Sequence, residues 1–296
     1  MDGGGQMSAL VQRRIGGLDV SAIGFGSMTL TQTPDADIER GMRAVHAAVD
    51  AGITLFDTAD SYGPTSEMGV NERALIAALR SSPADLDRVV IATKGGHTRH
   101  ENATWWIDGS PAHLARAARE SLRRLGLDAL PLYQHHRPDP RVPFEDSMGA
   151  LRQLVDDGIA VRIGVSNVDV PLLRIAQEAI GDALVSVQNE YSVHVRDSLD
   201  VLHVCEQDGL AFLAWGPFGG RLAAKHLGED AQVLADIAVR RGVSPQRVAL
   251  AWVLASSPAV IPIPGASRVE SVRDNVAALA LELTPDELAM LDGQSA

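Results

Sequence analysis

The chain has very little cysteine and an excess of negative charge, and each of these properties excludes a class of protein. Cys205 is the only cysteine among 296 residues, so an internal disulfide and a cysteine-based metal site are excluded and a reducing compartment is expected. The formal net charge of -12 argues against nucleic acid or an anionic membrane as a partner, because both bind a basic face. No uninterrupted apolar run approaches about 18 residues, and residues 1–6 hold no apolar core of a signal peptide. We therefore expect a cytoplasmic protein that is a monomer or a weak homo-oligomer.

Lysine is also scarce, and the position of one lysine is informative. The chain has two lysines, Lys94 and Lys225, although lysine and arginine together number 26. Lys94 ends a short, apolar, β-branched run over residues 88–93 and is followed by two glycines. A lysine is a compact ammonium whose pKa shifts when it is desolvated. We interpret Lys94 as the electrostatic centre of an active site, with a lysine that merely reaches solvent from a strand end as the alternative.

The rest of the chain alternates between short apolar runs and helical patterns. Eight strands each followed by a helix predict a closed (β/α)8 TIM barrel, an α/β fold whose strands are nearly continuous apolar runs. An N-terminal β-hairpin with Gly16 and Gly17 at its turn precedes the barrel, and extra C-terminal helices complete it. We expect a flexible tail over residues 1–12 and a single domain over 13–296. The expected strands are 21–26, 53–57, 88–93, 130–134, 160–165, 184–188, 211–215 and 259–263.

An open, doubly wound sheet is the structural alternative. It would carry a glycine fingerprint after the first strand, with an acidic residue closing the second strand. Residues 24–28 hold two of the three glycines, and the acidic residue is absent. The barrel is therefore favoured.

Four polar side chains lie at or just after three consecutive strand ends, where barrels carry their chemistry. A tyrosine has a pKa near 10, and a nearby ammonium is expected to lower it. A carboxylate keeps such a lysine charged in a dry site, and a histidine can orient a carbonyl group. The residues that can fill these roles and provide a general acid are Asp57, Tyr62, Lys94 and His136.

Five separated motifs resemble those of the aldo-keto reductases, and the resemblance runs from about Arg13 to the end of the chain. The motifs are residues 56–63 (FDTADSYG), 93–94 (TK), 133–136 (YQHH), 164–167 (GVSN) and 188–191 (QNEY). The resemblance implies a (β/α)8 barrel that binds NADPH and reduces an aldehyde or ketone to an alcohol. The catalytic residues would be Asp57, Tyr62, Lys94 and His136, with Tyr62 as the proton donor.

The resemblance also implies an extended cofactor site across the strand ends. Ser166, Asn167 and Gln188 would bind the nicotinamide carboxamide, and Trp215 would stack on the ring where the family commonly has tyrosine. Ser267 and Arg268, at a helix N-terminus, would bind the 2′-phosphate and favour NADPH over NADH. The remaining expected cofactor contacts are Gly26, Ser27, Met28, Asp57, Gly216, Pro217, Gly219, Arg221, Pro264, Gly265, Ser271, Asp274 and Asn275.

The substrate pocket is less clear from the sequence. Trp105 and Trp106, in a long segment over residues 95–109 that we expect to be a loop, could form one wall, with His135 and Arg137 as further substrate contacts. No metal site is expected, because the histidines of this region lack acidic or cysteine partners at useful spacing. Two other functions stay open: a non-catalytic NADP-binding subunit, and a Schiff-base lyase that uses Lys94 as its nucleophile.

Overall fold

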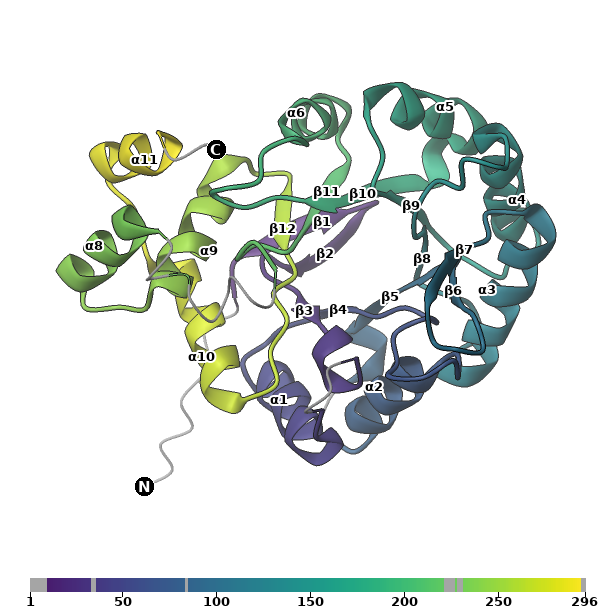
Figure 1. Cartoon of the computed structure of the whole chain (residues 1–296), viewed down its shortest axis with the longest axis horizontal. Coiled ribbons are helices and arrows are strands. Elements are labelled where there is room, and N and C mark those ends of the chain that lie inside the picture. The colour runs from purple at the N-terminus through teal and green to yellow at the C-terminus, as the bar shows by residue number, and fades with distance from the viewer. Residues whose placement is uncertain (1–9, 33–35, 83–84, 221–226, 228–230, 294–296) are drawn as a thin grey trace.

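A closed parallel barrel forms the centre of the molecule (Figure 1). The computed structural model describes residues 10–32, 36–82, 85–220, 227 and 231–293. Eight parallel strands form one sheet in the order β3, β4, β5, β8, β9, β10, β11, β12. Their bounds are β3 Phe25–Gly26, β4 Leu55–Asp57, β5 Val90–Gly95, β8 Leu132–His135, β9 Ile163–Ser166, β10 Leu184–Glu190, β11 Ala211–Trp215 and β12 Val260–Pro262.

The first and last strands of this sheet close the barrel through backbone hydrogen bonds. The amide of Gly24 donates to the carbonyl of Pro262 at 2.9 Å, and the amide of Gly26 donates to that of Pro264 at 3.1 Å. The backbones approach so closely that a Cβ atom at Gly26 would lie 2.6 Å from the Ile263 carbonyl oxygen. Glycine is therefore needed at this seam. The predicted (β/α)8 barrel is confirmed, and the open sheet is excluded.

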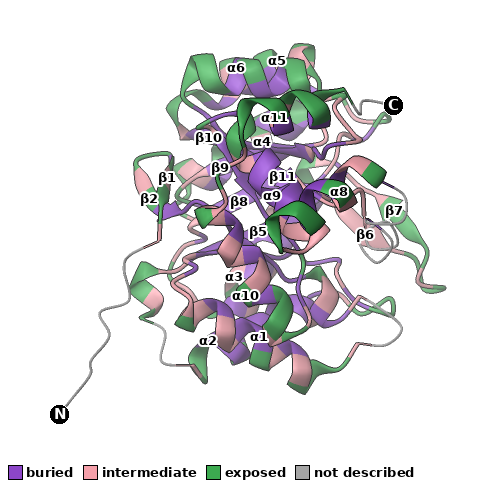
Figure 2. Cartoon of the chain, turned by 90° about the vertical axis from the view of Figure 1, so that its left-hand side faces the viewer, coloured by how far each residue is buried: buried purple, intermediate pink, exposed green. Residues whose placement is uncertain are grey.

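Helices surround the barrel and bury their apolar faces against it (Figure 2). Several begin where the sequence offers a capping side chain followed by proline, as at Ser244 before Pro245 and at Thr284 before Pro285. The predicted break near Gly242 separates α8 from α9, because Gly242 ends α8 in a left-handed conformation. The helices are α1 Ile38–Asp50, α2 Val70–Arg80, α3 Pro111–Leu125, α4 Phe144–Asp156, α5 Val170–Ile180, α6 Leu199–Asp208, α8 Gln232–Arg241, α9 Pro245–Ser256, α10 Val269–Ala277 and α11 Pro285–Asp292, with 3₁₀ turns at Met28–Leu30, Leu86–Arg88, Gly181–Ala183 and Ala278–Ala280.

Two hairpins lie at opposite ends of the barrel (Figure 2). The predicted N-terminal hairpin pairs β1 (Gln12–Ile15) with β2 (Leu18–Ser21). Ile15 and Val20 are fully buried in the apolar cluster that fills the barrel interior, so this hairpin closes the amino end of the barrel. The carboxyl end of the barrel stays open, and this is the end at which barrels of this kind carry their active sites.

The second hairpin corrects a sequence-based expectation. The segment after β5 is not a loop, because β6 (His97–Arg99) pairs antiparallel with β7 (Trp105–Ile107). Each strand has only three residues, and neither shows the apolar alternation by which strands are recognised. This hairpin stands over the carboxyl ends of the strands and supplies a wall to the cavity described below.

Candidate active site

A lysine and an aspartate form a buried ion pair at the carboxyl end of the barrel. The Lys94 Nζ atom on β5 lies 2.7 Å from Asp57 Oδ2 on β4, and the side chains are 0 % and 4 % exposed. Lys94 also donates to the Thr58 carbonyl oxygen at 2.9 Å and to the Tyr62 hydroxyl at 3.2 Å. The Gln188 side-chain amide donates to the other Asp57 oxygen at 2.8 Å. Every polar group of the pair is thereby oriented.

Strand geometry explains how residues so far apart in sequence meet. Side chains alternate between the two faces of a strand, so every second residue points into the barrel. Leu55, Val90 and Leu132 fill the barrel interior. The polar residues follow these apolar ones at even spacing: Asp57 comes two residues after Leu55, Lys94 four after Val90, and Gln134 two after Leu132. Gln134 donates a hydrogen bond to Asp57 at 3.3 Å. A polar layer therefore lies directly above the apolar interior.

The protonation states of the ion pair and of the tyrosine follow from burial and charge. Burial acts to lower the pKa of Lys94, but Asp57 and Tyr62 outweigh it, so the pKa is raised and the lysine is charged. Burial raises the pKa of Tyr62, and the opposing effect of Lys94 does not overcome it. The expected lowering of the tyrosine pKa by the ammonium is present, but burial outweighs it and the pKa stays above its ordinary value. Tyr62 is a protonated phenol in contact with a fixed cation.

His136 completes the cluster from the end of β8. Its ring lies edge-on to the Tyr62 ring, with 5.7 Å between centroids. Burial, with Lys94 and His97 as further causes, holds the pKa of His136 well below its usual range, so the imidazole is neutral. The backbone is fixed on both sides: the His136 amide donates to the Gly95 carbonyl, and the Asn167 side chain donates to the His136 carbonyl. A neutral imidazole beside a phenol is suited to binding a carbonyl oxygen.

A cavity of about 350 Å³ opens above these residues. Asp57, Tyr62 and His136 line it, while Lys94 lies beneath them with no exposed surface. The expected cofactor contacts that line it are Gly26, Met28, Asp57, Ser166, Asn167, Gln188, Trp215, Gly216, Pro217 and Gly265. These residues come from both the first and the last strands of the barrel, so the cavity spans its mouth.

Several expected cofactor contacts lie elsewhere. Ser27 is fully buried, and its hydroxyl contacts the Asp57 carbonyl and the Asn71 side chain, so it is not directed into the cavity. Asp274 is bound to Ser244 and Arg247. Arg221 lies outside the described residues. Gly219, Pro264, Ser267, Arg268, Ser271 and Asn275 also do not line the cavity.

The N-terminus of α10 remains available to a ligand. Arg268 occupies its N-cap position with no side-chain hydrogen bond to the helix, and its side chain is exposed. Free backbone N–H groups and an arginine at a helix start are suited to binding a phosphate. Gly265 lines the cavity and comes two residues before Ser267 and three before Arg268. The start of α10 therefore adjoins the rim of the cavity.

The β6–β7 hairpin forms one wall of the cavity with Trp105 and His97. His97 was not among the predicted site residues, although it comes only three residues after Lys94. Its ring lies 4.3 Å from that of His136 and 5.2 Å from that of Trp105, measured between centroids. Burial, followed by Arg137, lowers the pKa of His97 to about 4, so this imidazole is also neutral.

Arg99 fastens the hairpin to the loop that carries Tyr62. Its guanidinium donates to the carbonyl oxygens of Ser61, Gly63 and Ala103 and to the Gln32 side chain, and it stacks over Trp105 at 3.4 Å. Tyr62 lies between two of these carbonyl groups in the chain. The hairpin and the tyrosine are therefore held in a fixed relation.

Two expected substrate contacts do not reach the cavity. Trp106 packs beneath Arg141, 4.0 Å from the guanidinium carbon to the ring centroid, on the other side of the hairpin from Trp105. His135 is fully buried against Phe144, with 5.6 Å between ring centroids. Because adjacent strand residues face opposite ways, His135 points toward the helices when His136 points toward the cavity. Of the four expected substrate contacts, Trp105 and Arg137 line the cavity.

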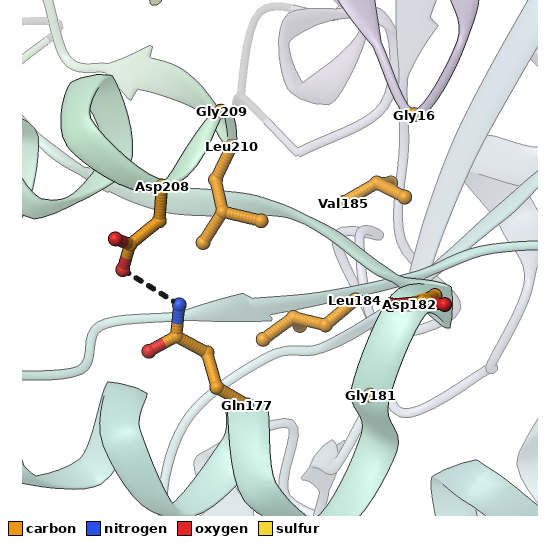
Figure 3. Close-up of a pocket in the computed structure, with 9 residues that line it drawn as sticks. All are labelled: Gly16, Gln177, Gly181, Asp182, Leu184, Val185, Asp208, Gly209 and Leu210. Carbon is orange, nitrogen blue, oxygen red and sulfur yellow. Dashed lines mark hydrogen bonds between the residues drawn. The ribbon is translucent and has the colours of Figure 1, made fainter.

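A second cavity, of about 390 Å³, lies at the amino end of the barrel, beside the turn of the β1–β2 hairpin (Figure 3). Two of its polar side chains pair with each other, because Gln177 donates to Asp208 at 2.9 Å, and Arg174, outside the lining, contacts the same carboxylate. None of the predicted site residues lines it. Elsewhere among the described residues, no group of three histidine, cysteine, aspartate or glutamate side chains is placed to hold a metal ion, and no helix has the length and hydropathy of a membrane span.

The fold and the site together define the class of protein: a (β/α)8 barrel with a cluster of ionisable side chains at the carboxyl ends of its strands. The sequence model of the Aldo/keto reductase family matches residues 22–296, and the chain belongs to this family. It is 34 % identical over 283 residues to an uncharacterized oxidoreductase, C215.11c, of Schizosaccharomyces pombe, covering 94 % of this chain and 88 % of that protein.

Solved structures of the family have the same fold. An aldo/keto reductase from Klebsiella pneumoniae in complex with NADP and acetate is 29 % identical, with a TM-score of 0.80 over 96 % of this chain and 95 % of that one. The thermostable aldo-keto reductase Tm1743, solved with the inhibitor epalrestat, is also 29 % identical, with a TM-score of 0.81 over 96 % of this chain and all of that one. Glycerol dehydrogenase AKR11B4 from Gluconobacter oxydans is 26 % identical, with a TM-score of 0.82 over 96 % and 94 % of the two chains.

Proposed function

We propose that the protein is an NADPH-dependent reductase of aldehydes or ketones in which Tyr62 is the general acid. The observation that carries this proposal is the contact of the Tyr62 hydroxyl with Lys94, whose charge Asp57 holds in place beside a neutral His136. Membership of the aldo/keto reductase family supports the reaction class. The NADP complex of the Klebsiella pneumoniae relative supports the cofactor.

The residues around the cavity fit a nicotinamide dinucleotide. Trp215 offers an aromatic face with an indole nitrogen that has no hydrogen-bond partner among the described residues. Gly216 and the residues after it form a glycine-rich wall in which Gly216 has a positive φ of 61°. The uncapped start of α10, with Arg268, fits a phosphate and favours NADPH over NADH. When bound, NADPH supplies the hydride that reduces the carbonyl carbon.

The protein's own residues handle the proton. Because the pKa of Tyr62 is raised, the phenol is protonated at neutral pH and has a proton to give. The proton moves from the Tyr62 hydroxyl to the carbonyl oxygen as that oxygen gains negative charge. The negative charge left on the tyrosine is stabilised by Lys94, 3.2 Å away in a buried site. His136, as a neutral imidazole, binds and orients the carbonyl oxygen from the other side.

The charge state of Lys94 argues against the Schiff-base lyase. A nucleophilic lysine has to be an unprotonated amine, and such lysines have lowered pKa values. The pKa of Lys94 is raised, and its nitrogen already donates to Asp57, Thr58 and Tyr62. No geometric feature favours this alternative.

The decisive variant is Tyr62→Phe. It removes the proton donor and leaves the ring, so we expect turnover to fall by about 10²–10⁴-fold, the usual contribution of a general acid. NADPH binding, followed by quenching of tryptophan fluorescence, should stay within about twofold. The matched control is Tyr133→Phe, which removes a buried hydroxyl that has no hydrogen-bond partner among the described residues and does not line the cavity.

Retained turnover in Tyr62→Phe would refute the assignment of the acid. The non-catalytic alternative has its own test, which is a panel of aldehydes and ketones offered to the unmodified protein. Binding of NADPH without oxidation by any member of the panel would refute carbonyl reduction.

A further inference from the structure

Arg137 is a cation that lines the cavity. It follows His136 directly at the end of β8 and is half-buried. Across the described residues, its guanidinium makes no hydrogen bond and no ion pair. The arginines near it differ: Arg99 donates to four oxygen atoms, and Arg141 is bound to Asp139. A guanidinium has five N–H donors, and a half-buried one is stabilised by a ligand that accepts hydrogen bonds from them.

Among the described residues that line the cavity, no carboxylate pairs with Arg137. Asp57 is the one carboxylate among the lining residues, and its charge is matched by Lys94. Glu190, at the end of β10, is the acidic residue that Arg137 influences most directly, yet the two are not within ion-pair distance. Burial raises the pKa of Glu190 against the effect of Arg137, and no hydrogen bond or ion pair joins the two side chains among the described residues. The two imidazoles facing Arg137, those of His97 and His136, are neutral.

The cavity that Arg137 lines also has aromatic and apolar walls. Trp105 and the neutral His97 come from the β6–β7 hairpin, and Met28 comes from the segment after the first strand. A ligand that contacts these walls therefore has an apolar body and places one negative group at the guanidinium. A carboxylate suits a single arginine, because its two oxygens match the planar fork of the guanidinium. A phosphate dianion would leave charge unmatched here.

We propose that Arg137 is an anion subsite of the substrate cavity, and that the substrates are aldehydes or ketones carrying a carboxylate on an apolar body. The substrate class rests on the proposed carbonyl reduction, whereas the anion subsite does not. Arg137 binds the carboxylate, while Tyr62 and His136 bind the carbonyl oxygen. Selectivity for the acid over a neutral analogue is thus set by one side chain.

The test uses a matched pair of probes, 4-carboxybenzaldehyde and methyl 4-formylbenzoate, which differ in the negative charge. Binding to the NADP-loaded protein is measured by isothermal titration calorimetry, which requires no turnover. We expect the acid to bind at least tenfold more tightly than the ester. In Arg137→Gln this acid-to-ester ratio should fall by about 10–100-fold, the range for a charged hydrogen bond. Arg137→Lys should restore part of it.

A charge-matched control variant separates the effect of the Arg137 subsite on binding from the effect of the protein's net charge. Arg14→Gln changes the net charge by the same amount at the opposite end of the barrel, where the side chain is 74 % exposed, and should leave the ratio unchanged. Equal affinity for acid and ester in the unmodified protein would overturn the proposal, as would an unaltered ratio in Arg137→Gln. Tighter binding of 4-formylphenyl phosphate than of the carboxylate would overturn the choice of carboxylate.

A turnover measurement distinguishes failure of the subsite from failure of the reaction. Consumption of NADPH with both aldehydes at equal KM would refute the anion subsite and leave carbonyl reduction standing. Absence of NADPH consumption, together with Arg137-dependent binding of the acid, would refute carbonyl reduction and leave the subsite standing. If both proposals are correct, Arg137→Gln raises KM for the acid by about 10–100-fold with a smaller change in kcat.

Discussion

Replacing Lys94 with methionine is expected to destabilise the protein by about 3–5 kcal/mol, the usual effect of leaving one partner of a buried ion pair alone. Methionine fills much of the same volume, so loss of packing contributes little. The effect comes from Asp57, which is almost fully buried and would lose the ammonium 2.7 Å away. The Thr58 carbonyl would also lose its donor.

The size of this effect is limited by the contacts that remain. The side-chain amides of Gln188 and Gln134 would still donate to Asp57 at 2.8 Å and 3.3 Å. These bonds stabilise the carboxylate but carry no full positive charge, so they offset only part of the loss. The double variant Asp57→Asn/Lys94→Met should recover at least about 2 kcal/mol, because the amide is neutral and keeps an oxygen that accepts both bonds.

Urea unfolding followed by tryptophan fluorescence measures all four corners of this double-mutant cycle. The expected result is a Lys94→Met protein less stable than Asp57→Asn/Lys94→Met. A Lys94→Met loss below about 1 kcal/mol would match an exposed ion pair rather than a buried one. That result, or additivity of the two single changes, would refute the view that the pair is a charge-matched buried unit.

The remaining predictions concern turnover, cofactor choice and pH. Lys94→Arg should lower kcat by at least about tenfold at unchanged NADPH affinity, because the planar guanidinium does not fit the compact site; full activity would contradict the role of the lysine. Arg268→Gln should weaken NADPH binding by about tenfold and leave NADH binding unchanged in fluorescence titrations, and equal losses would remove the 2′-phosphate assignment. Burial lowers the pKa of His135 to about 4, so the folded state binds fewer protons than the unfolded state and stability falls as pH drops from about 6.5 toward 4. His135→Leu should reduce this loss by about 2–3 kcal/mol between pH 7.5 and pH 4.5 in chemical denaturation, and an unchanged loss would contradict it.

The sequence was sufficient to predict the barrel and the central cluster, for the same physical reason. Parallel strands in βα units bring their carboxyl ends to one rim, so polar residues at the ends of consecutive strands have to meet there. Asp57, Lys94 and His136 follow apolar runs whose inward-facing positions are fixed by the period of two. That these three residues lie close together could therefore be predicted without knowledge of side-chain conformations.

The sequence was not sufficient where a contact depends on a partner outside the local pattern. Ser27 comes at a strand end like the other site residues, but its hydroxyl is taken by Asn71, 44 positions away. The β6–β7 hairpin has strands too short for a periodic signal, so the place of His97 was hidden. The pKa of Tyr62 depends on the balance between burial and the field of Lys94, and a motif records only that both residues are present.

The seam between β3 and β12 has a consequence for biosynthesis. Gly26 and Gly265 line the same cavity, yet they are separated by most of the chain, and their contact carries a high cost in loop closure. During translation β3 is made early, and it has no neighbour on its open edge until β12 emerges. The ligand cavity is therefore completed only after β12 and Gly265 have been made, and a chain that terminates before them would carry the Tyr62, Lys94 and His136 side chains without an enclosed site.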